Sequence, residues 1–322
     1  MLVGRSGLSS EAIRGAVLGH VIGDALGVPV EFFPREKLDD SPVSQMQSNG
    51  THHMPKGTWS DDSSMMLCTL MSIVEKETLD FDDMMSRFSR WVKEGYMTPH
   101  GKPFGIGRST LSSLGRYWRG EIATKCGGTT EKDNGNGSLM RILPVVLYNA
   151  FASDVLTDQE KIRNVCMVSS LTHAHPRAYM ACGIYSFILE EVLEKPNKSS
   201  VHAGLDNARN FFECNSESRY YERLFSIDFG SLPKTAIKSS GYVVDTLEAA
   251  VWCILNSDSY KEAVLQAVNL GGDTDTIAAV AGGLAGALYT YSALEQEWLD
   301  AIVKRDGIMQ ICDRFEKKLD ML

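Results

Sequence analysis

The stretch GGDTDTIAAVAGGLAGAL, residues 271–288, decides the fold class of this chain. It predicts a helix over Thr274–Leu288 whose residues after the first turn are all small or aliphatic, so that neighbouring helices can approach it closely. The uncharged run extends from Thr276 to Leu294 and is long enough to cross a membrane. Its many glycine and hydroxyl-bearing residues make it only weakly hydrophobic. We therefore interpret it as the central, buried helix of a helical protein and expect no membrane contact.

Helical periodicity continues on both sides of this segment. In Phe81–Glu94, for example, apolar residues recur at the i, i+3, i+4, i+7 spacing of one buried helix face. Strand signals are nearly absent, because no stretch alternates cleanly between polar and β-branched residues. We predict an all-α fold, a compact multi-helix bundle that forms one domain over residues 1–322. The other predicted helices are Glu11–Leu26 (capped by Ser9 or Ser10), Ser63–Lys76, Ser109–Trp118, Leu139–Phe151, Asp158–Ser170, Pro176–Leu193, Val201–Phe212, Val243–Asn256, Tyr260–Val268 and Glu297–Lys318.

Composition excludes several classes of protein. With 43% hydrophobic and 23% charged residues, the 322-residue chain is typical of a globular protein and not of a disordered one. Its formal net charge of −9 argues against binding nucleic acid through phosphate neutralisation. The seven cysteines are scattered without C-x-x-C spacing, as expected for free thiols in a reducing cytoplasm. His20 and Asp24 interrupt the N-terminal apolar run, which is unlike a signal peptide. No coiled-coil seam occurs, so we expect a monomer.

Two acidic segments stand directly before apolar helices. They are Ser60-Asp61-Asp62 and Asp273-Thr274-Asp275-Thr276. Each segment alone is better explained as a helix N-cap whose acids face the helix dipole. Together they supply four carboxylates and the hydroxyls of Ser60 and Thr276, a hard oxygen ligand set that suits Mg²⁺ or Mn²⁺. A site with two divalent metal ions is therefore a candidate.

Four further loop segments are compatible with a ligand site. Asp24 interrupts the apolar face of the first helix and is equally well a structural acid or a site residue, and Glu31 follows the Gly/Pro exit of that helix. The Gly135-Asn136-Gly137 loop leads into a helix and offers backbone N–H groups to a phosphate, although a plain turn has the same composition. His173, in Thr172-His173-Ala174-His175, has no zincin spacing and is either a ligand-facing loop residue or an ordinary surface histidine. Tyr242 precedes a helix, where it either stacks on a base or packs as a helix staple.

The six segments together resemble the ADP-ribosylglycohydrolase family. They are Gly23–Gly27, Ser60–Asp62, Asn136–Arg141, Thr172–Pro176, Ser239–Thr246 and Gly271–Thr276, in the family order and across nearly the whole chain. The similarity is greatest to the branch of the bacterial dinitrogenase reductase-activating glycohydrolase. The resemblance implies an orthogonal all-α bundle with two Mg²⁺ or Mn²⁺ ions in a central cleft. It also implies hydrolysis of the bond between ADP-ribose and its acceptor.

The resemblance also assigns roles to individual residues. It implies that Ser60, Asp61, Asp62, Asp273, Asp275 and Thr276 hold the metal ions. By the same match, Gly135, Asn136 and Gly137 cradle the diphosphate, His173 lies near the ribose and Tyr242 near the adenine. Glu31 falls where some members place an acid beside the metals, and it is our candidate general acid or base. The catalytic set is then Glu31, Asp61, Asp62 and Asp275, and the partner is ADP-ribose or an ADP-ribosylated protein.

One departure from the family pattern bears on the acceptor. Arginine-specific relatives tend to carry an aspartate where Gly105 stands, in Pro103-Phe104-Gly105-Ile106-Gly107. The default expectation is hydrolysis of an ADP-ribosyl-arginine linkage by water attack at C1″ of the distal ribose. Gly105 leaves three alternatives open: another linkage or a free ADP-ribose conjugate, another acid such as Glu31, or a protein that binds ADP-ribose without cleaving it. A metal-dependent phosphoesterase would use the same ligand set.

Overall fold

The chain folds into helices joined by short loops. The computed structural model describes residues 9–152 and 155–319, and within these ranges there are α-helices and 3₁₀ turns but no β-strand. The expected all-α bundle is confirmed. The α-helices are α1 Ser10–Gly27, α2 Arg35–Asp40, α3 Asp61–Lys76, α4 Phe81–Glu94, α5 Arg108–Trp118, α6 Leu143–Phe151, α7 Asp158–Ser169, α8 Pro176–Glu194, α9 Lys198–Phe211, α10 Val243–Leu255, α11 Tyr260–Val268, α12 Thr274–Tyr289, α13 Gln296–Ala301 and α14 Arg305–Leu319.

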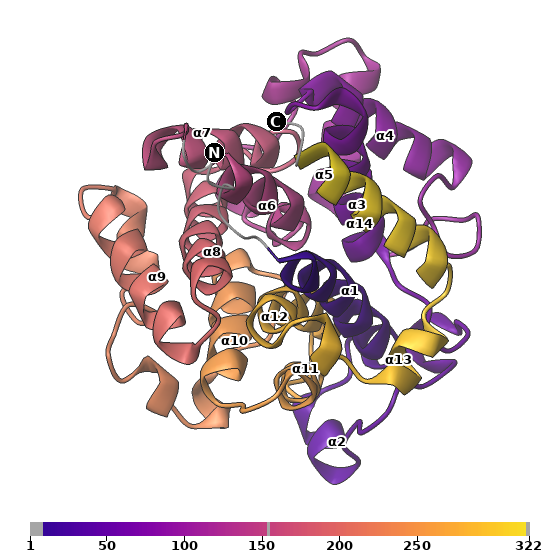
Figure 1. Ribbon diagram of the computed structural model, residues 1–322, viewed down its shortest axis with the longest axis vertical. Helices are drawn as coiled ribbons and strands as arrows, with labels where there is room; N and C mark the ends of the chain where they lie inside the picture. Colours follow the sequence, from indigo (N-terminus) through magenta and orange to yellow (C-terminus); the bar gives the residue numbers. More distant parts are fainter. Residues whose placement is uncertain (1–8, 153–154, 320–322) are drawn as a thin grey trace, which may run out of the picture.

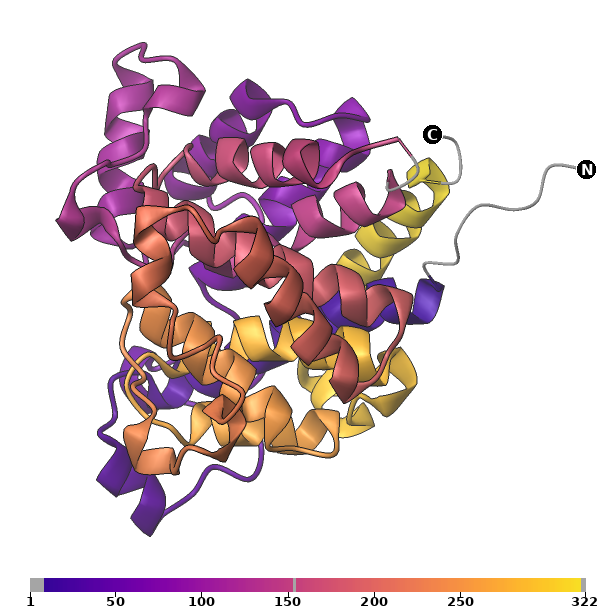
Figure 2. The same ribbon diagram turned by 90° about the vertical axis from the view of Figure 1, so that its left-hand side faces the viewer.

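Helices α1 and α12 lie side by side in the middle of the bundle, although they come from opposite ends of the sequence (Figure 1). Helices α3, α4 and α14 lie on one side of this pair, and α8, α9 and α10 lie on the other. A view turned by 90° shows α8 and α9 packed along each other over one face of the molecule (Figure 2). The buried apolar side chains form one continuous core around the central pair.

The α1–α12 contact is made by backbone atoms. Gly15 and Gly19 on α1 face Gly286 and Gly282 on α12, with the four-residue spacing that keeps both pairs on one helix face. A Cβ atom added to Gly286 would lie 1.9 Å from the Gly15 carbonyl oxygen, and one added to Gly282 would lie 2.3 Å from the Gly19 oxygen. No larger residue fits at these positions without moving the helices apart. The close approach of the two backbones is therefore the physical reason for the small residues that predicted a central helix.

The central helices explain the apolar segments that resemble membrane spans. The segment Ser10–Val30 is long and apolar enough to cross a bilayer, but 94% of its most hydrophobic window is buried inside the protein. Every residue of α12 from Thr274 to Leu288 is also buried. Both segments are apolar because they form the core of the bundle, as we expected for the second one.

The sequence prediction was wrong for the C-terminal helix, which is not continuous over Glu297–Lys318. It breaks into α13 and α14 at Ile302–Lys304, where Lys304 has a φ of 61°. The break frees backbone groups that bind the loop before α3. The N–H of Val303 donates to the Gly57 oxygen (3.1 Å), and the Trp59 indole N–H donates to the Val303 oxygen (2.9 Å). Periodicity cannot reveal this break, because the partners lie far away in the sequence.

Smaller differences follow from capping and from proline. The predicted helix Leu139–Phe151 is a 3₁₀ turn followed by α6, with Pro144 in the first turn of α6, where its missing N–H is tolerated. Helix α3 begins at Asp61 rather than Ser63, since Ser60 is its N-cap. The short helix α2 was not predicted, because its six residues carry only one buried side chain, Leu38.

A paired substitution tests the central contact. Gly286→Ala should lower the free energy of unfolding by about 2 kcal/mol, because overpacking a rigid backbone contact costs more than the helix propensity gained. Gly307→Ala is the matched control, since its new methyl group would meet no atom within 4 Å, and it should be neutral or slightly stabilising. Urea unfolding followed by circular dichroism measures both variants. Equal stability of the two variants would contradict the proposed role of the contact.

Candidate active site

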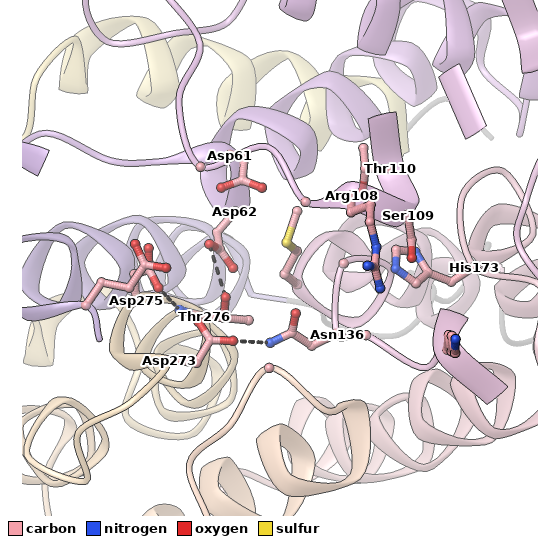
Figure 3. A pocket seen from close by; sticks show the side chains of 18 residues that line it. Asp61, Asp62, Arg108, Ser109, Thr110, Asn136, His173, Asp273, Asp275 and Thr276 are labelled. Carbon is pink, nitrogen blue, oxygen red and sulfur yellow. Dashed lines mark hydrogen bonds between the residues drawn. The ribbon is translucent and has the colours of Figure 1, made fainter. Parts of the chain in front are cut away.

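The two acidic segments meet at the N-termini of α3 and α12. Asp61 and Asp62 are the first two residues of α3, and Asp273 is the N-cap of α12 with Asp275 in its first turn. All four side chains line one cavity of about 280 Å³ (Figure 3). Thr276 lines the same cavity, and Glu31 reaches it from the end of the 3₁₀ turn that follows α1.

Asp24 holds the start of α3 in place from within α1. Its buried carboxylate accepts hydrogen bonds from the Ser60 N–H (2.9 Å), the Ser63 N–H (3.0 Å) and the Ser63 hydroxyl (2.5 Å). These bonds satisfy N–H groups at the helix N-terminus that would otherwise be buried without a partner. Burial raises the pKa of Asp24 to about 6. Asp24 is therefore a residue that positions the acidic segment, in agreement with its interpretation as a structural acid.

The carboxylates form two overlapping groups in which each residue offers an oxygen within 4.8 Å of the others. One group is Asp24, Asp62 and Asp275, and the other is Glu31, Asp273 and Asp275. Burial, and after it the charge of neighbouring carboxylates, raises the pKa of Asp61, Asp62 and Asp275 well above the ordinary value. So many adjacent carboxylates repel one another once they are ionised.

The donor set fits a hard divalent cation. The Oδ1 atom of Asp62 is buried without a hydrogen-bond partner, which is costly for a carboxylate oxygen unless a cation faces it. The other oxygen of Asp62 accepts from the hydroxyls of Ser60 (3.0 Å) and Thr276 (3.4 Å). Oxygen donors of this kind suit Mg²⁺ or Mn²⁺. Ser60 reaches the group through Asp62 and does not line the cavity itself.

The glycine loop forms the opposite wall of the cavity. The side-chain amide of Asn136 donates to the Asp273 carboxylate (2.7 Å) and to the Thr246 hydroxyl (2.9 Å). The Asn136 N–H donates to the Gly241 oxygen (3.1 Å), which ties the loop to the segment before α10. Asn136 therefore connects the acidic group with the predicted phosphate cradle, and Figure 3 shows it between the two ends of the cavity.

His173 lies beside this loop in a buried position. Burial, followed by the charge of Arg141, lowers the pKa of His173 to about 3, so the imidazole is neutral at pH 7. Its Nδ1 atom is 2.9 Å from the Thr172 hydroxyl, which also accepts from the Arg141 guanidinium (2.7 Å). A Cβ atom at Gly137 would lie 2.7 Å from the imidazole Cε1 atom. The histidine therefore acts as a fixed, uncharged wall of the cavity and not as a proton donor at neutral pH.

Tyr242 lies outside the cavity lining. It is the N-cap of α10 and pairs through its backbone with Gly135, next to the glycine loop. Its ring centre is 5.9 Å from the Arg177 guanidinium, which itself stacks on Tyr220 at 3.4 Å. Tyr242 is thus adjacent to the outer end of the glycine loop, and any contact with a bound molecule would be beyond this cavity.

The sequence analysis missed several residues of the site. Arg108, Ser109 and Thr110, at the start of α5, line the cavity end opposite the carboxylates (Figure 3). Lys132 is a further cation in the cavity lining. No side chain caps α5, so its N–H groups are available to an anion. The sequence did contain a signal for this end of the cavity, because a helix start was predicted at Ser109.

His52 is a further site residue that the sequence did not indicate. Its Nε2 atom is hydrogen-bonded to the Glu31 carboxylate, and no spacing in the sequence indicates this pairing.

Gly105 lies against the acidic group. Its φ is +79°, and a Cβ atom at this position would lie 2.1 Å from the Asp61 Oδ1 atom. The backbone here therefore approaches Asp61 as closely as a glycine allows. An aspartate at this position would require the Asp61 carboxylate to move.

The fold and the site define a class, that of all-α hydrolases with a carboxylate group beside a glycine-rich cradle. The ADP-ribosylglycohydrolase family model matches residues 7–321. The chain belongs to the ADP-ribosylglycohydrolase family and is a glycohydrolase. The resemblance found in the sequence motifs is confirmed.

The similar proteins include two bacterial hydrolases of named activity. The chain is 31% identical to the ADP-ribosylarginine hydrolase Tri1 of Serratia proteamaculans, over 95% of this chain and 79% of the relative. It is 29% identical to the ADP-ribosyl-[dinitrogen reductase] glycohydrolase of Rhodospirillum rubrum, over 89% of each chain. Among solved structures, an ADP-ribosylglycohydrolase-related protein complex matches with a TM-score of 0.80 and 30% identity, covering 96% of this chain and 98% of that chain.

The raised pKa values predict how stability changes with pH and metal. In EDTA, Asp62 and its neighbours bind protons in the folded state that the unfolded chain has released, because unfolded carboxylates titrate near pH 4. The melting temperature should therefore fall as the pH rises from 5 to 8. Mg²⁺ or Mn²⁺ should raise it more at pH 8 than at pH 5, since the ion competes with protons.

Differential scanning fluorimetry measures this dependence, and Asp62→Asn serves as the comparison. The variant has one ionisable carboxyl fewer, so its melting temperature in EDTA should depend less on pH, and it should gain less from the metal ion. A melting temperature of the unsubstituted protein that neither pH nor divalent metal changes would contradict the assignment of a metal site.

Proposed function

We propose that this chain hydrolyses the N-glycosidic bond between ADP-ribose and an arginine side chain of a protein, with two Mg²⁺ or Mn²⁺ ions. The observation that carries the proposal is the polarity of the cavity. Asp61, Asp62, Asp273 and Asp275 line one end, and Arg108 and the free N-terminus of α5 line the other (Figure 3). A ligand with a diphosphate at one end and a developing positive charge at the other matches this field.

Different residues would bind different parts of the ligand between the two ends of the cavity. The diphosphate would lie on Gly135–Gly137 and the α5 N-terminus, where backbone N–H groups and Arg108 favour an anion. The neutral His173 would border the distal ribose, with the adenine directed toward Tyr242. Asn136 keeps the Asp273 carboxylate oriented through its 2.7 Å hydrogen bond. The distal ribose is then left facing the carboxylates.

The metal ions would be held by Ser60, Asp61, Asp62, Asp273, Asp275 and Thr276. When bound, they supply an oriented and acidified water molecule. The hydroxyl of water adds to C1″ as the bond to the guanidine nitrogen breaks, and one proton of the water ends on that nitrogen. The ionised Asp61 and Asp275 stabilise the oxocarbenium character that develops at C1″.

Glu31 is the proposed proton carrier of the reaction. Because His52 binds its Oε2 atom, the Oε1 atom remains to accept a proton from water and return it to the leaving nitrogen. The residue lines the cavity and offers an oxygen within 4.8 Å of carboxylate oxygens of Asp273 and Asp275. Glu31 would then supply the acid–base chemistry for which arginine-specific relatives tend to have an aspartate at the position of Gly105.

The relatives named for arginine hydrolysis make arginine the first acceptor to examine. Gly105 favours a second candidate, a protein that binds ADP-ribose without cleaving it, because it removes an acid beside the scissile bond. We propose that the protein acts in the cytoplasm as a monomer on an ADP-ribosylated protein, and that it does not act on membranes or nucleic acids.

A substrate panel distinguishes these functions. Purified protein is incubated with arginine-, serine- and nucleobase-linked ADP-ribose and with acylated ADP-ribose, each with Mg²⁺, Mn²⁺ or EDTA, and free ADP-ribose is measured. We expect metal-dependent release from the arginine linkage. Release from another linkage alone would change the acceptor. Binding of ADP-ribose without any release would support the second candidate, and formation of AMP or phosphate would indicate a phosphoesterase.

Asp61→Ala tests the catalytic assignment. The substitution removes a buried carboxylate whose charge is unfavourable to folding, so the variant should remain folded while activity falls by at least about 10³-fold, as expected for loss of a group that stabilises transition-state charge. Activity is compared at saturating metal, and folding is checked by circular dichroism. An unfolded variant would show instead that Asp61 is structural.

A further inference from the structure

A second hollow adjoins the active-site cavity. It has a volume of about 730 Å³ and shares three wall residues with the cavity, namely Glu31, Gly241 and Asp273. The remaining wall is formed mainly by residues 32–36 and 238–240, with Asp245. The two spaces therefore meet at the carboxylate end of the cavity, on the side away from Arg108. We call this second hollow the acceptor groove.

An exposed aromatic ring borders the groove beside Glu31. Phe32 is 68% exposed, and its backbone has a φ of 65°, which is rarely adopted by a bulky residue. Its N–H donates to the Gly272 oxygen (2.7 Å), and the Gly272 N–H donates to the Phe33 oxygen (2.9 Å). The turn is thus bound to the loop that carries Asp273. The fold tolerates both a strained backbone and an exposed ring at this position, and ligand contact is a physical reason for both.

Arg35 fixes the same turn from the other side. Its guanidinium donates to the backbone oxygens of Leu270 (2.8 Å), Lys234 (2.6 Å) and Ile237 (2.5 Å). The segment that carries Phe32 is therefore attached to two neighbouring loops and is preorganised. The Phe32 ring also lies next to His52, with ring centres 6.5 Å apart, and His52 binds Glu31.

The charges of the groove favour a cationic occupant. Glu36 and Asp245 line it in addition to Glu31 and Asp273. The groove has two cations, Arg35 and Lys238. Arg35 donates its N–H groups to backbone carbonyls and the Ser239 hydroxyl, so four carboxylates face one remaining cation, Lys238. Carboxylates around an exposed aromatic ring attract arginine and lysine side chains through ion pairing and cation–π contact.

We propose that the acceptor groove binds the polypeptide that carries the ADP-ribosylated residue, with Phe32 packed on that segment and Glu36 and Asp245 facing basic residues around it. The inference rests on the proposed function: with the diphosphate at the α5 end, the leaving group emerges beside Glu31, where the groove begins. Small conjugates of ADP-ribose would react without using the groove, whereas a modified protein would use it.

Two substrates with the same bond separate these contributions. One is a peptide with ADP-ribosyl-arginine flanked by lysines, and the other is ADP-ribosylguanidine, which lacks the peptide. Phe32→Ala should lower kcat/KM for the peptide about 10-fold, mainly through KM, as for the loss of an aromatic anchor. The value for ADP-ribosylguanidine should change less than about twofold, within the scatter of a surface substitution.

Three further variants serve as controls. Phe32→Tyr keeps the ring and should retain most of the peptide activity. Ile227→Ala removes another exposed apolar side chain, 85% exposed and outside the groove, and should match the unsubstituted protein with both substrates. Glu36→Lys should raise KM for the lysine-flanked peptide and lower it for a glutamate-flanked one.

Distinct outcomes would overturn the inference. Equal losses with both substrates would mean that Phe32 acts on the catalytic centre, and no loss with either would mean that the groove is not used. If the unsubstituted protein cleaved neither substrate, the proposed function would fail. Calorimetry would then still decide about the groove, because the peptide should bind more tightly than ADP-ribose and lose this advantage in Phe32→Ala.

Discussion

The close contact between α1 and α12 is the constraint on which the rest of the structure depends. Glycines on both helices let the backbones touch, and the contact continues to the end of α1, where a Cβ atom at Gly27 would lie 2.4 Å from the Asp275 Cα. The Thr274 hydroxyl donates to the Gly27 oxygen (2.9 Å). Helix packing thus places the acidic start of α12 beside Asp24 of α1. Residues that are far apart in the sequence come together because no side chain separates the two helices.

The helix packing also brings several carboxylates close together at the site. Asp24 binds the N-terminus of α3, so Asp62 is brought to within 4.8 Å of Asp24 and Asp275. Carboxylates in such a position are unfavourable by themselves, and their raised pKa values express this cost. Because the carboxylates repel one another without a cation, the stability of the folded protein should depend on a bound divalent cation. The same proximity gives the cavity its negative end, opposite Arg108.

The part of the molecule that we propose selects the acceptor is the rim beside the acidic group. Gly105 approaches Asp61 without contributing a functional group, while Glu31, His52 and Phe32 form the neighbouring rim. The loop before α12 carries the Asp273 carboxylate and is hydrogen-bonded to the turn of Phe32. The proposed acid–base residue and the proposed acceptor groove therefore share one rim, which is separate from the helical core.

Periodicity and small residues were sufficient to determine the all-α class and the positions of most helices, because these depend on local patterns of burial. Ordered motifs also indicated the family and the acidic segments, since a carboxylate before an apolar helix is a local feature. Tertiary structure alone decided the break between α13 and α14, the role of Asp24, the pairing of His52 with Glu31 and the place of Tyr242 outside the cavity. Each of these depends on contacts between segments distant in the chain, whose distances and burial are set only when the helices pack.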